Sequence, residues 1–275
     1  MSSNDFNISV IIPFYKADEF FDECIESVLA QTRPAQEIII INDNSGEASL
    51  EYLKKFNDVK IITIINLNEP HGASGARNVG LKKASGNWIA FQDADDIWEL
   101  DKLETQIKQL ETNDWDACHT GLITFSEEEA FISQYIDKPS PMTLSELVKS
   151  SHITPPSLLI QKSAVMEVGG FDTNFKTSGD YELSIRLVKS GVNIGFIPKV
   201  LIRVRRSNHG NVSSNGFRTF RNHYRLVCKH KDVFREFAGF NGTRKFLAKS
   251  LRESGGKIGG VKGLLVSRLG QVLGF

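Results

Sequence analysis

The sequence predicts an α/β fold built on a mostly parallel sheet, and two observations support this prediction. Runs rich in β-branched residues alternate along the first hundred residues with stretches of helical periodicity, which is typical of strand–helix–strand units. These runs are apolar throughout instead of alternating with polar residues, as in strands that are buried on both faces. Such sheets have right-handed crossovers and bind ligands outside the carboxyl ends of their strands.

The predicted elements follow in chain order. The run 8–14 is the first strand, and 18–31 places Phe21, Cys24 and Val28 on one helical stripe. Strands are expected next at 37–41, 59–65 and 88–91, with helices at 48–56 and 76–84.

The pattern changes after a helix that is expected to begin near Trp98. Strand-like runs at 121–125 and 130–136 indicate a mixed or antiparallel part of the sheet, and two further strands are expected on either side of Pro198. The remaining expected elements are helices at 142–150, 163–168 and 180–190, a strand at 157–160, and a helical stripe that restarts at Phe217.

Composition indicates a soluble globular protein. The 275 residues are 40% hydrophobic and 24% charged, and the formal net charge of zero gives no bias toward nucleic acid. Three cysteines without a CxxC pair fit a reducing compartment. The polar N-terminus does not resemble a signal peptide, and no apolar run has the roughly 20 residues of a membrane span. We therefore expect a cytoplasmic protein.

The C-terminal part differs in charge from the rest. From Arg218 onward there are 13 basic and 3 acidic residues. The prediction is a main domain at 1–215 and a basic helical extension at 216–275, with the glycines of 255–260 as a flexible break. These helices either pack on the domain or lie on anionic lipid at the inner face of the cytoplasmic membrane, where each basic residue contributes roughly 1 kcal/mol.

An acidic cluster follows the predicted strand 88–91. Asp93 and Asp95 form a D-x-D arrangement of hard oxygen ligands that suits Mg²⁺ or Mn²⁺ together with substrate phosphates. The alternative is a solvated turn that caps the following helix. The position after a fourth buried strand favours the metal site, and Asp96 is expected only to support the helix.

Two other strand ends carry residues that suit a nucleotide. Asp43 could accept from a base N–H, and Tyr15 could stack on the base, although turn residues are ordinary at such positions. The Gly-rich stretch 71–78 matches neither a dinucleotide fingerprint nor a Walker loop. Arg77, near the start of the helix that follows, would still attract anions.

These segments together resemble glycosyltransferase family 2, which has the GT-A fold. The resemblance rests on an ordered set of motifs over about residues 7–210: Val10-Ile11-Ile12-Pro13-Phe14-Tyr15, Ile40-Ile41-Asn42-Asp43, Ala76-Arg77-Asn78, Phe91-Gln92-Asp93-Ala94-Asp95-Asp96, Val168-Gly169-Gly170-Phe171-Asp172 and Gly179-Asp180-Tyr181-Glu182. It implies a metal-dependent inverting enzyme that moves a sugar, most often from a UDP-sugar, to a hydroxyl of a glycan or lipid-linked acceptor in surface polysaccharide biosynthesis.

The resemblance also implies residue roles. Pro13, Tyr15 and Asp43 would border the base, Arg77 would hold the nucleotide, and Asp93 would face the ribose. Asp95 would coordinate the metal, and Asp180 matches the catalytic base. Trp98 would line the acceptor side, and His209 would reach the diphosphate, unless it is an ordinary loop histidine. The alternative for Asp180 is a helix N-cap.

The sequence departs from the family pattern at two positions. Asn42 stands where the family usually has Asp, and Gly179 where it has Glu, so Glu182 is the next candidate base. Two other functions therefore remain open. One is a nucleotidyltransferase, which the segment 15–18 disfavours because it lacks a basic Gly-rich loop. The other is a non-catalytic nucleotide- or glycan-binding module.

Overall fold

Nine strands form one mixed sheet in the computed structural model, which describes residues 6–126, 130–206, 216–258 and 260–273. The strand order is β3-β2-β1-β4-β8-β6-β9-β5, with β7 also paired to β6. The strands are β1 (Ile8–Phe14), β2 (Glu37–Asn42), β3 (Ile62–Asn66), β4 (Trp88–Phe91), β5 (Ile97–Trp98), β6 (Ala117–Ser126), β7 (Phe131–Tyr135), β8 (Leu159–Gln161) and β9 (Ile194–Arg206).

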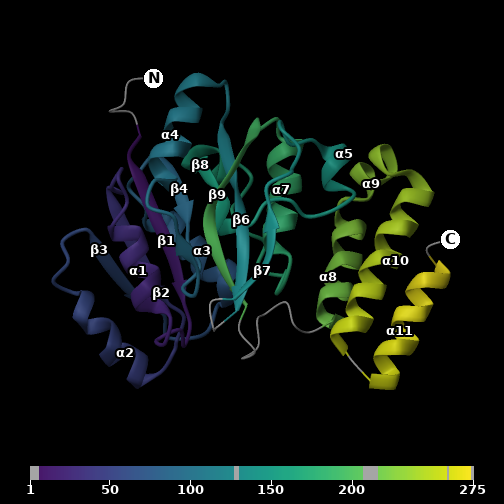
Figure 1. The fold of residues 1–275 in the computed structure, drawn as a ribbon, viewed down its shortest axis with the longest axis horizontal. Coiled ribbons are helices and arrows are strands. Elements are labelled where there is room, and N and C mark those ends of the chain that lie inside the picture. Colours follow the sequence, from purple (N-terminus) through teal and green to yellow (C-terminus); the bar gives the residue numbers. More distant parts are fainter. Residues whose placement is uncertain (1–5, 127–129, 207–215, 259, 274–275) are drawn as a thin grey trace.

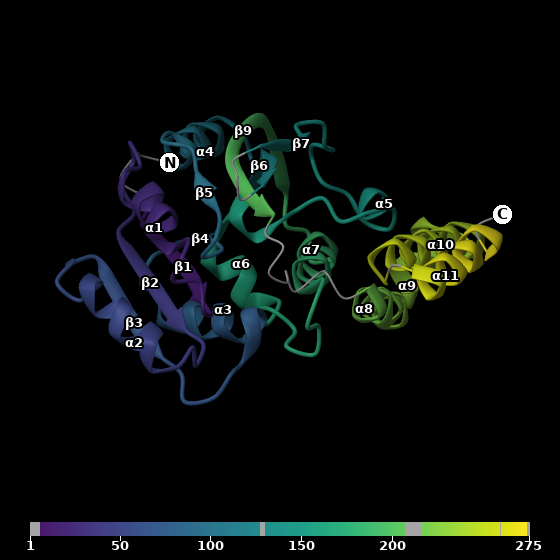
Figure 2. The same cartoon turned by 60° about the horizontal axis from the view of Figure 1, so that its bottom comes forward.

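The first four strands are parallel, as their apolar runs predict. Val10 and Ile12 of β1 face one hydrophobic cluster, and Ile11 between them faces the other. Helices cover both faces (Figure 1, Figure 2), and every residue of β1 except the half-buried Pro13 is shielded from water. This burial on both sides explains why the strand sequence does not alternate.

The helices divide between the two clusters. Residues of α1, α2 and α4 pack in the first, and residues of α3 and α5 to α10 pack in the second. Their bounds are α1 (Phe21–Leu29), α2 (Glu47–Leu53), α3 (Gly72–Lys83), α4 (Lys102–Thr112), α5 (Leu144–Leu147), α6 (Lys162–Glu167), α7 (Gly179–Lys189), α8 (Gly216–Lys229), α9 (Lys231–Phe237), α10 (Gly239–Ile258) and α11 (Gly260–Leu273).

Two local predictions are wrong, and a third holds only in part. Trp98 does not begin a helix but lies in the short strand β5, and the helix begins at Lys102. Pro198 does not separate two strands, because β9 runs through it with a register shift that leaves Pro198 and Lys199 unpaired and exposed. Pro lacks a backbone donor, and such a bulge tolerates it. The break expected within 255–260 is confirmed only in its position: α10 continues through Gly255 and Gly256 and ends at Ile258, and α11 begins at Gly260.

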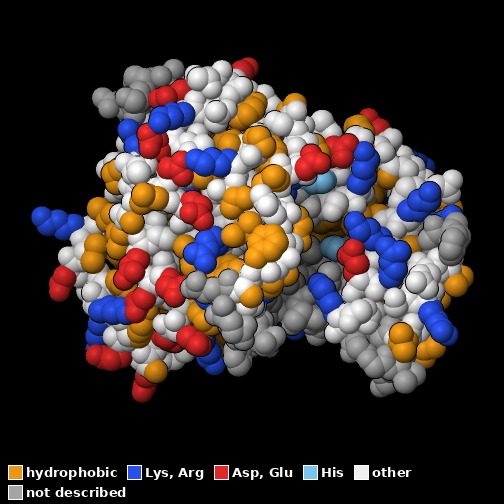
Figure 3. All heavy atoms as spheres, viewed as in Figure 1, with side chains coloured by type: hydrophobic (Ala, Val, Ile, Leu, Met, Phe, Trp, Pro, Cys, Tyr) orange, Lys and Arg blue, Asp and Glu red, His pale blue; other side chains and the backbone are white. Residues whose placement is uncertain are grey.

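The C-terminal helices pack on the rest of the chain through α7. Leu226 of α8, Phe234 of α9 and Phe246 of α10 belong to the same hydrophobic cluster as Tyr181 of α7. Asn222 Nδ2 of α8 also donates to the backbone oxygen of Thr177, at 3.0 Å. The extension is thus helical, as predicted, and it packs on the domain. Figure 3 shows Lys and Arg side chains gathered over this part of the molecule.

Candidate active site

The carboxyl ends of β1, β2 and β4 meet at one edge of the sheet. Phe14 pairs with Asn42, and the backbone N–H of Asp43 donates to the carbonyl of Phe14 at 2.9 Å. The N–H of Gln92 donates to the carbonyl of Ile11 at 3.0 Å. Tyr15, Asp43 and Asp93, each just beyond a strand end, therefore lie at the same edge.

Asp43 fixes the start of α3. Its two carboxylate oxygens accept from the backbone N–H groups of His71 and Gly72, at 2.6 and 2.7 Å, and the side chain is almost fully buried. Tyr15 beside it is 55% exposed and Pro13 is half-buried, so both present surface to a ligand. The β2 end thus orders the Gly-rich loop that the sequence singled out.

Asn42 has a structural explanation. Its Nδ2 donates to Asn66 Oδ1 on β3 at 2.9 Å, and its Oδ1 accepts from the N–H of Ser45 at 3.2 Å. A carboxylate at this position lacks the donor that the first bond uses. Asn42, where the family usually has Asp, therefore forms a hydrogen bond that joins the ends of β2 and β3.

Arg77 and Asp93 form an ion pair across the strand edge. The guanidinium also lies 5.4 Å from the ring centre of Phe171, and Arg77 Nε has no hydrogen-bond partner among the described residues. Since Arg77 is only 8% exposed, its orientation is set by these two contacts. A cation held this way can bind an anionic ligand without losing much side-chain entropy.

Asn78 joins two motifs that are far apart in the sequence. Its side chain donates to the carbonyl of Phe171 and accepts from the N–H of Phe171, both at 2.8 Å. The Phe171 ring meets Phe91 of β4 edge-on at 5.3 Å. This two-way bond holds the segment that leads to α7 against α3, next to the Arg77–Asp93 pair.

Asp95 and Asp96 lie on a turn that Arg205 supports. The N–H of Arg205 donates to Asp96 Oδ1 at 3.0 Å, and its Nε donates to the carbonyl of Asp95 at 3.3 Å. Arg205 also pairs with Glu23 of α1. Asp96 therefore anchors β9 to the turn; the expectation that it supports the following helix is wrong, because Asp101 precedes α4.

Burial raises the pKa of Asp95 to about 6, and the negative charge of Asp93 adds to this effect. Burial, then the charges of Asp95 and Asp93, raises the pKa of Asp96 well above its usual range. The turn therefore holds more negative charge than its own basic neighbours neutralise. A positively charged ligand would lower both pKa values.

The donor set fits a divalent cation that a substrate helps to hold. No cluster of three or more potential ligand residues exists in the described part of the chain. Mg²⁺ is often bound by one or two carboxylates together with substrate phosphates. Asp95 supplies such a carboxylate. The two other carboxylates of the cluster are already bound within the protein, since Asp93 pairs with Arg77 and Asp96 is bonded to Arg205 of β9.

Asp180 lies in the first turn of α7, close to this edge. Burial raises its pKa above the ordinary value of 3.8, whereas the positive charge of Arg77 lowers it and the negative charge of Asp93 raises it. The N-cap is Ser178 and not Asp180, so the capping alternative is wrong. Gly179 is buried against α3, where an added Cβ would lie 2.7 Å from Ser74 Oγ. Asp180 is thus held next to the Arg77–Asp93 pair.

Trp98 and Glu182 are placed differently from what the resemblance implies. Trp98 is 3% exposed in the first hydrophobic cluster, with Lys102 Nζ 3.9 Å from its ring centre. Glu182 is fully buried and its carboxylate contacts Arg186, Lys229 and His230. Both environments are structural, so their acceptor-side roles stay predictions without support from these positions. His209 lies outside the described residues.

Arg205, Asn78 and Phe171 support the site although no role was predicted for them. Asn78 and Phe171 stand in motifs quoted for the resemblance, and Arg205 is one of several basic residues of β9, so its sequence does not single it out. The partners of Asn78 and Arg205 are 93 and 109 residues away in the chain, so no local pattern points to them.

Comparison with known proteins identifies the family. Residues 9–169, more than half of the chain, match the family described as Glycosyl transferase family 2. The chain belongs to this family. It is therefore a glycosyltransferase, and neither a nucleotidyltransferase nor a non-catalytic module is supported.

The family 2 glycosyltransferase has relatives of known name and structure. It is 29% identical over 228 residues to an Escherichia coli protein named UDP-Glc:alpha-D-GlcNAc-diphosphoundecaprenol beta-1,3-glucosyltransferase WfgD, covering 82% of this chain and 86% of that one. Staphylococcus aureus TarS 1-349 in complex with UDP-GlcNAc superposes with a TM-score of 0.69 at 16% identity, covering 98% of this chain and 88% of that one.

A third similarity is to an archaeal structure. The mannosyltransferase PcManGT from Pyrobaculum calidifontis, in complex with GDP-Man and Mn²⁺, has a TM-score of 0.65 at 15% identity, covering 98% of this chain and 81% of that one. At these identities the two structures show that the fold is shared. The GT-A fold predicted from the motifs is thereby confirmed.

Proposed function

We propose that this glycosyltransferase transfers a sugar from a UDP-sugar to a hydroxyl of a lipid-linked acceptor sugar, with inversion, in surface polysaccharide biosynthesis. The observation that carries the proposal is the position of Asp180, whose carboxyl lies within electrostatic reach of Arg77 and Asp93 at the edge where β1, β2 and β4 end. The named E. coli relative supports the class of donor and acceptor.

Each residue of the edge has a part in the proposed reaction. Tyr15 stacks on the base beside Asp43, and Arg77 with Asp93 orients the nucleotide. Asp180 accepts the proton of the acceptor hydroxyl while the oxygen of that hydroxyl bonds to C1 of the donor sugar. The bond from C1 to the donor diphosphate breaks, and the nucleoside diphosphate leaves with the bonding electrons. The raised pKa of Asp180 makes it a stronger base than a solvent-exposed aspartate.

Mn²⁺ or Mg²⁺ at Asp95, when bound, would stabilise the negative charge of the departing diphosphate. Arg205 keeps the turn of Asp95 in place through its bond to the Asp95 carbonyl. Burial and the charge of Asp93 raise the pKa of Asp95 although Arg205 and Arg206 lower it, and this net excess of negative charge supports the assignment.

Asp180→Asn tests the proposed base. The variant keeps the size of the side chain and removes its basicity, so transfer should fall by at least about 100-fold, the lower range for a general base. Binding of UDP with Mn²⁺, measured by calorimetry, should stay unchanged. Unchanged turnover would assign the base to another residue, and a wild-type protein that binds no nucleoside diphosphate in the presence of Mn²⁺ would refute the proposed reaction.

We also propose a peripheral contact of the C-terminal helices with anionic lipid, where a lipid-linked acceptor would reside. Exposed apolar side chains of α11, among them Leu265 and Leu269, lie in a region that also exposes Lys249, Arg252 and Arg268. Within the described residues, no helix is long and apolar enough to cross a membrane. Flotation with anionic and neutral vesicles tests the contact: binding that requires the anionic lipid and is lost in Leu265→Ser/Leu269→Ser supports it.

A further inference from the structure

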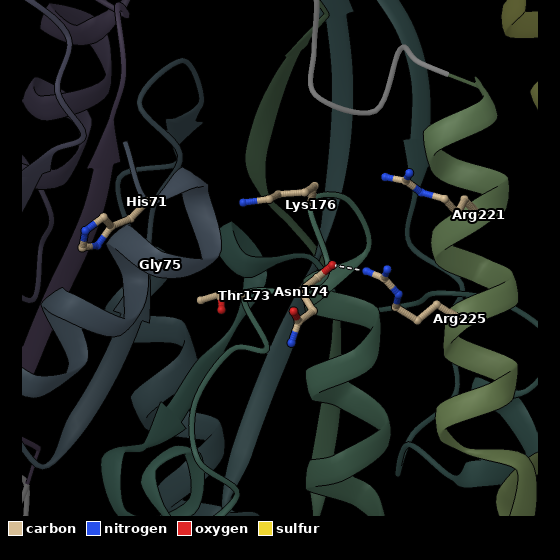
Figure 4. Close-up of a pocket in the computed structure, with 7 residues that line it drawn as sticks. All are labelled: His71, Gly75, Thr173, Asn174, Lys176, Arg221 and Arg225. Carbon is tan, nitrogen blue, oxygen red and sulfur yellow. Dashed lines mark hydrogen bonds between the residues drawn. The ribbon is translucent and has the colours of Figure 1, made fainter. Parts of the chain in front are cut away.

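A basic pocket lies between the domain and the C-terminal helices. Its volume is about 580 Å³, and its lining comes from the start of α3, the segment that precedes α7, and one face of α8. Figure 4 shows Lys176 extending toward the α3 side, and Arg221 and Arg225 extending from α8. None of the described lining residues is acidic; they are His71, Gly75, Thr173, Asn174, Lys176, Arg221 and Arg225.

Two of the three Lys and Arg side chains of this pocket bind no other group in the described part of the chain. Arg225 Nη1 donates to the carbonyl of Asn174, which fixes it at the rim. Lys176 and Arg221 have no hydrogen bond or ion pair among residues 6–126, 130–206, 216–258 and 260–273. By contrast, Lys229 on the same helix as Arg221 pairs with Asp172 and Glu182. Two uncompensated positive charges therefore face one hollow, which favours an anionic ligand.

The pocket is lined by the segment that leads into α7 and by the start of α3, the two elements that carry Asp180 and Arg77. Lys176 precedes Asp180 by four residues, and Gly75 precedes Arg77 by two. The close approach of Gly179 to Ser74 joins the two segments. Asn222 of α8 donates to Thr177 Oγ1 at 2.6 Å, so α8 is fixed to the same segment. The elements that line the pocket are therefore in contact with one another.

We propose that this pocket binds the diphosphate of the lipid-linked acceptor and so places a hydroxyl of the acceptor sugar at Asp180. This inference rests on the proposed function. In such an acceptor the diphosphate is bonded directly to the sugar, so the anion lies one sugar ring from the reacting hydroxyl. One end of the pocket is at His71, whose backbone N–H bonds to Asp43 on the donor side, and Gly75 in its lining follows Ser74, which lies against Gly179, the neighbour of Asp180. The volume of the pocket leaves room for the sugar as well.

Calorimetry with octyl diphosphate, at a fixed Mn²⁺ concentration and with UDP saturating the donor site, tests the pocket directly. The wild-type protein should bind the probe, and Lys176→Gln/Arg221→Gln should bind it at least about tenfold more weakly, since a charge-assisted hydrogen bond contributes about 1.5–3 kcal/mol. Lys82→Gln removes an exposed lysine from the far end of α3 and should bind as the wild type does. No binding by the wild type, or equal binding by the double variant, overturns the inference.

Transfer kinetics provide the second readout. The double variant should raise the KM for a diphosphate-linked acceptor at least about tenfold and leave the KM for a neutral alkyl glycoside of the same sugar unchanged. A rise in both KM values, or a weaker affinity for UDP, would show that the pocket does not bind the acceptor diphosphate specifically, and would contradict the inference. A wild type that binds no UDP contradicts the proposed function instead, and the octyl diphosphate titration without UDP still decides whether the pocket takes a diphosphate.

Discussion

Replacing Glu182 by Gln tests the junction between α7 and the C-terminal helices. The carboxylate is fully buried and accepts from Arg186 Nε at 2.8 and 2.9 Å, and it contacts Lys229 Nζ at 2.7 Å and His230 Nε2 at 3.1 Å. Glutamine keeps the volume and removes the charge. The variant leaves Arg186 and Lys229 without their shared partner.

The magnitude follows from the pKa of Glu182. Side-chain bonds from His230, Arg186 and Lys229 outweigh the opposing effect of burial and lower this pKa from 4.5 to about 2. At about 1.4 kcal/mol for each tenfold change in proton affinity, this corresponds to about 3 kcal/mol of stability. Removing one partner of a buried ion pair costs a similar amount, about 3–5 kcal/mol.

Urea denaturation at several pH values measures the effect. The folded pKa lies below the unfolded value, so the contribution of Glu182 is fully present above pH 4.5 and is lost as the pH falls toward about 2. Glu182→Gln should therefore lower the free energy of unfolding by about 3 kcal/mol at pH 7, and the difference from the wild type should narrow below pH 4.5. Transfer per folded molecule should persist, since Glu182 has no access to solvent.

Asp232→Asn is the matched control. Asp232 also bridges α7 to the C-terminal helices, through Lys189, but its side chain is 57% exposed. Water screens an exposed ion pair, so this variant should unfold at nearly the same urea concentration as the wild type. If Glu182→Gln were no more destabilising than the control, or if its effect did not depend on pH, the ion cluster would not stabilise the junction.

Three further outcomes are expected. The initial rate of transfer should fall on the acid side at a pH above 3.8, because burial raises the pKa of Asp180; a rate that stays constant down to pH 4 would contradict its role as the base. Asn78→Ala should lower the free energy of unfolding by about 1–3 kcal/mol in urea, since it leaves both backbone groups of Phe171 unpaired, and a neutral effect would show that water replaces the side chain. Burial lowers the pKa of Lys102 to about 7, so the unfolded chain binds the extra proton between pH 7 and 10.5 and stability rises with pH there. Lys102→Met should flatten this rise in stability with pH, and an unchanged dependence on pH would show that other groups cause the rise.

The sheet and the strand-end residues were predictable because their causes are local. An apolar run such as Val10 to Ile12 requires cover on both faces, and parallel strands bring Tyr15, Asp43 and Asp93 to one edge. The helix–helix contacts were not predictable in this way. An added Cβ at Gly270 would lie 2.7 Å from the Ala248 carbonyl, so this glycine allows α11 to pack closely on α10. A break was expected only at the glycines of 255–260, and no sequence pattern indicated this role of Gly270.

The residues that support the site also could not be predicted from local sequence patterns. Sequence motifs identified Asp180 and Asp95, but the residues that orient them act across long separations. Arg205 reaches the Asp95 turn from the last strand, and Glu182, two residues from Asp180, serves the junction with α8. Spacing along the chain contains no information on which of two neighbouring carboxylates turns inward.

The shared hydrophobic cluster of α7 and the C-terminal helices has a consequence for where this enzyme can be divided. α7 carries Asp180, the proposed base, and Tyr181 beside it meets His223 of α8 and Phe246 of α10 at ring-centre distances of 6.0 and 6.1 Å. A chain that ends at residue 215 would therefore expose to water the apolar side of α7, the helix that carries the proposed base. Exchange of this extension between relatives would require the outer side chains of α7 to change with it.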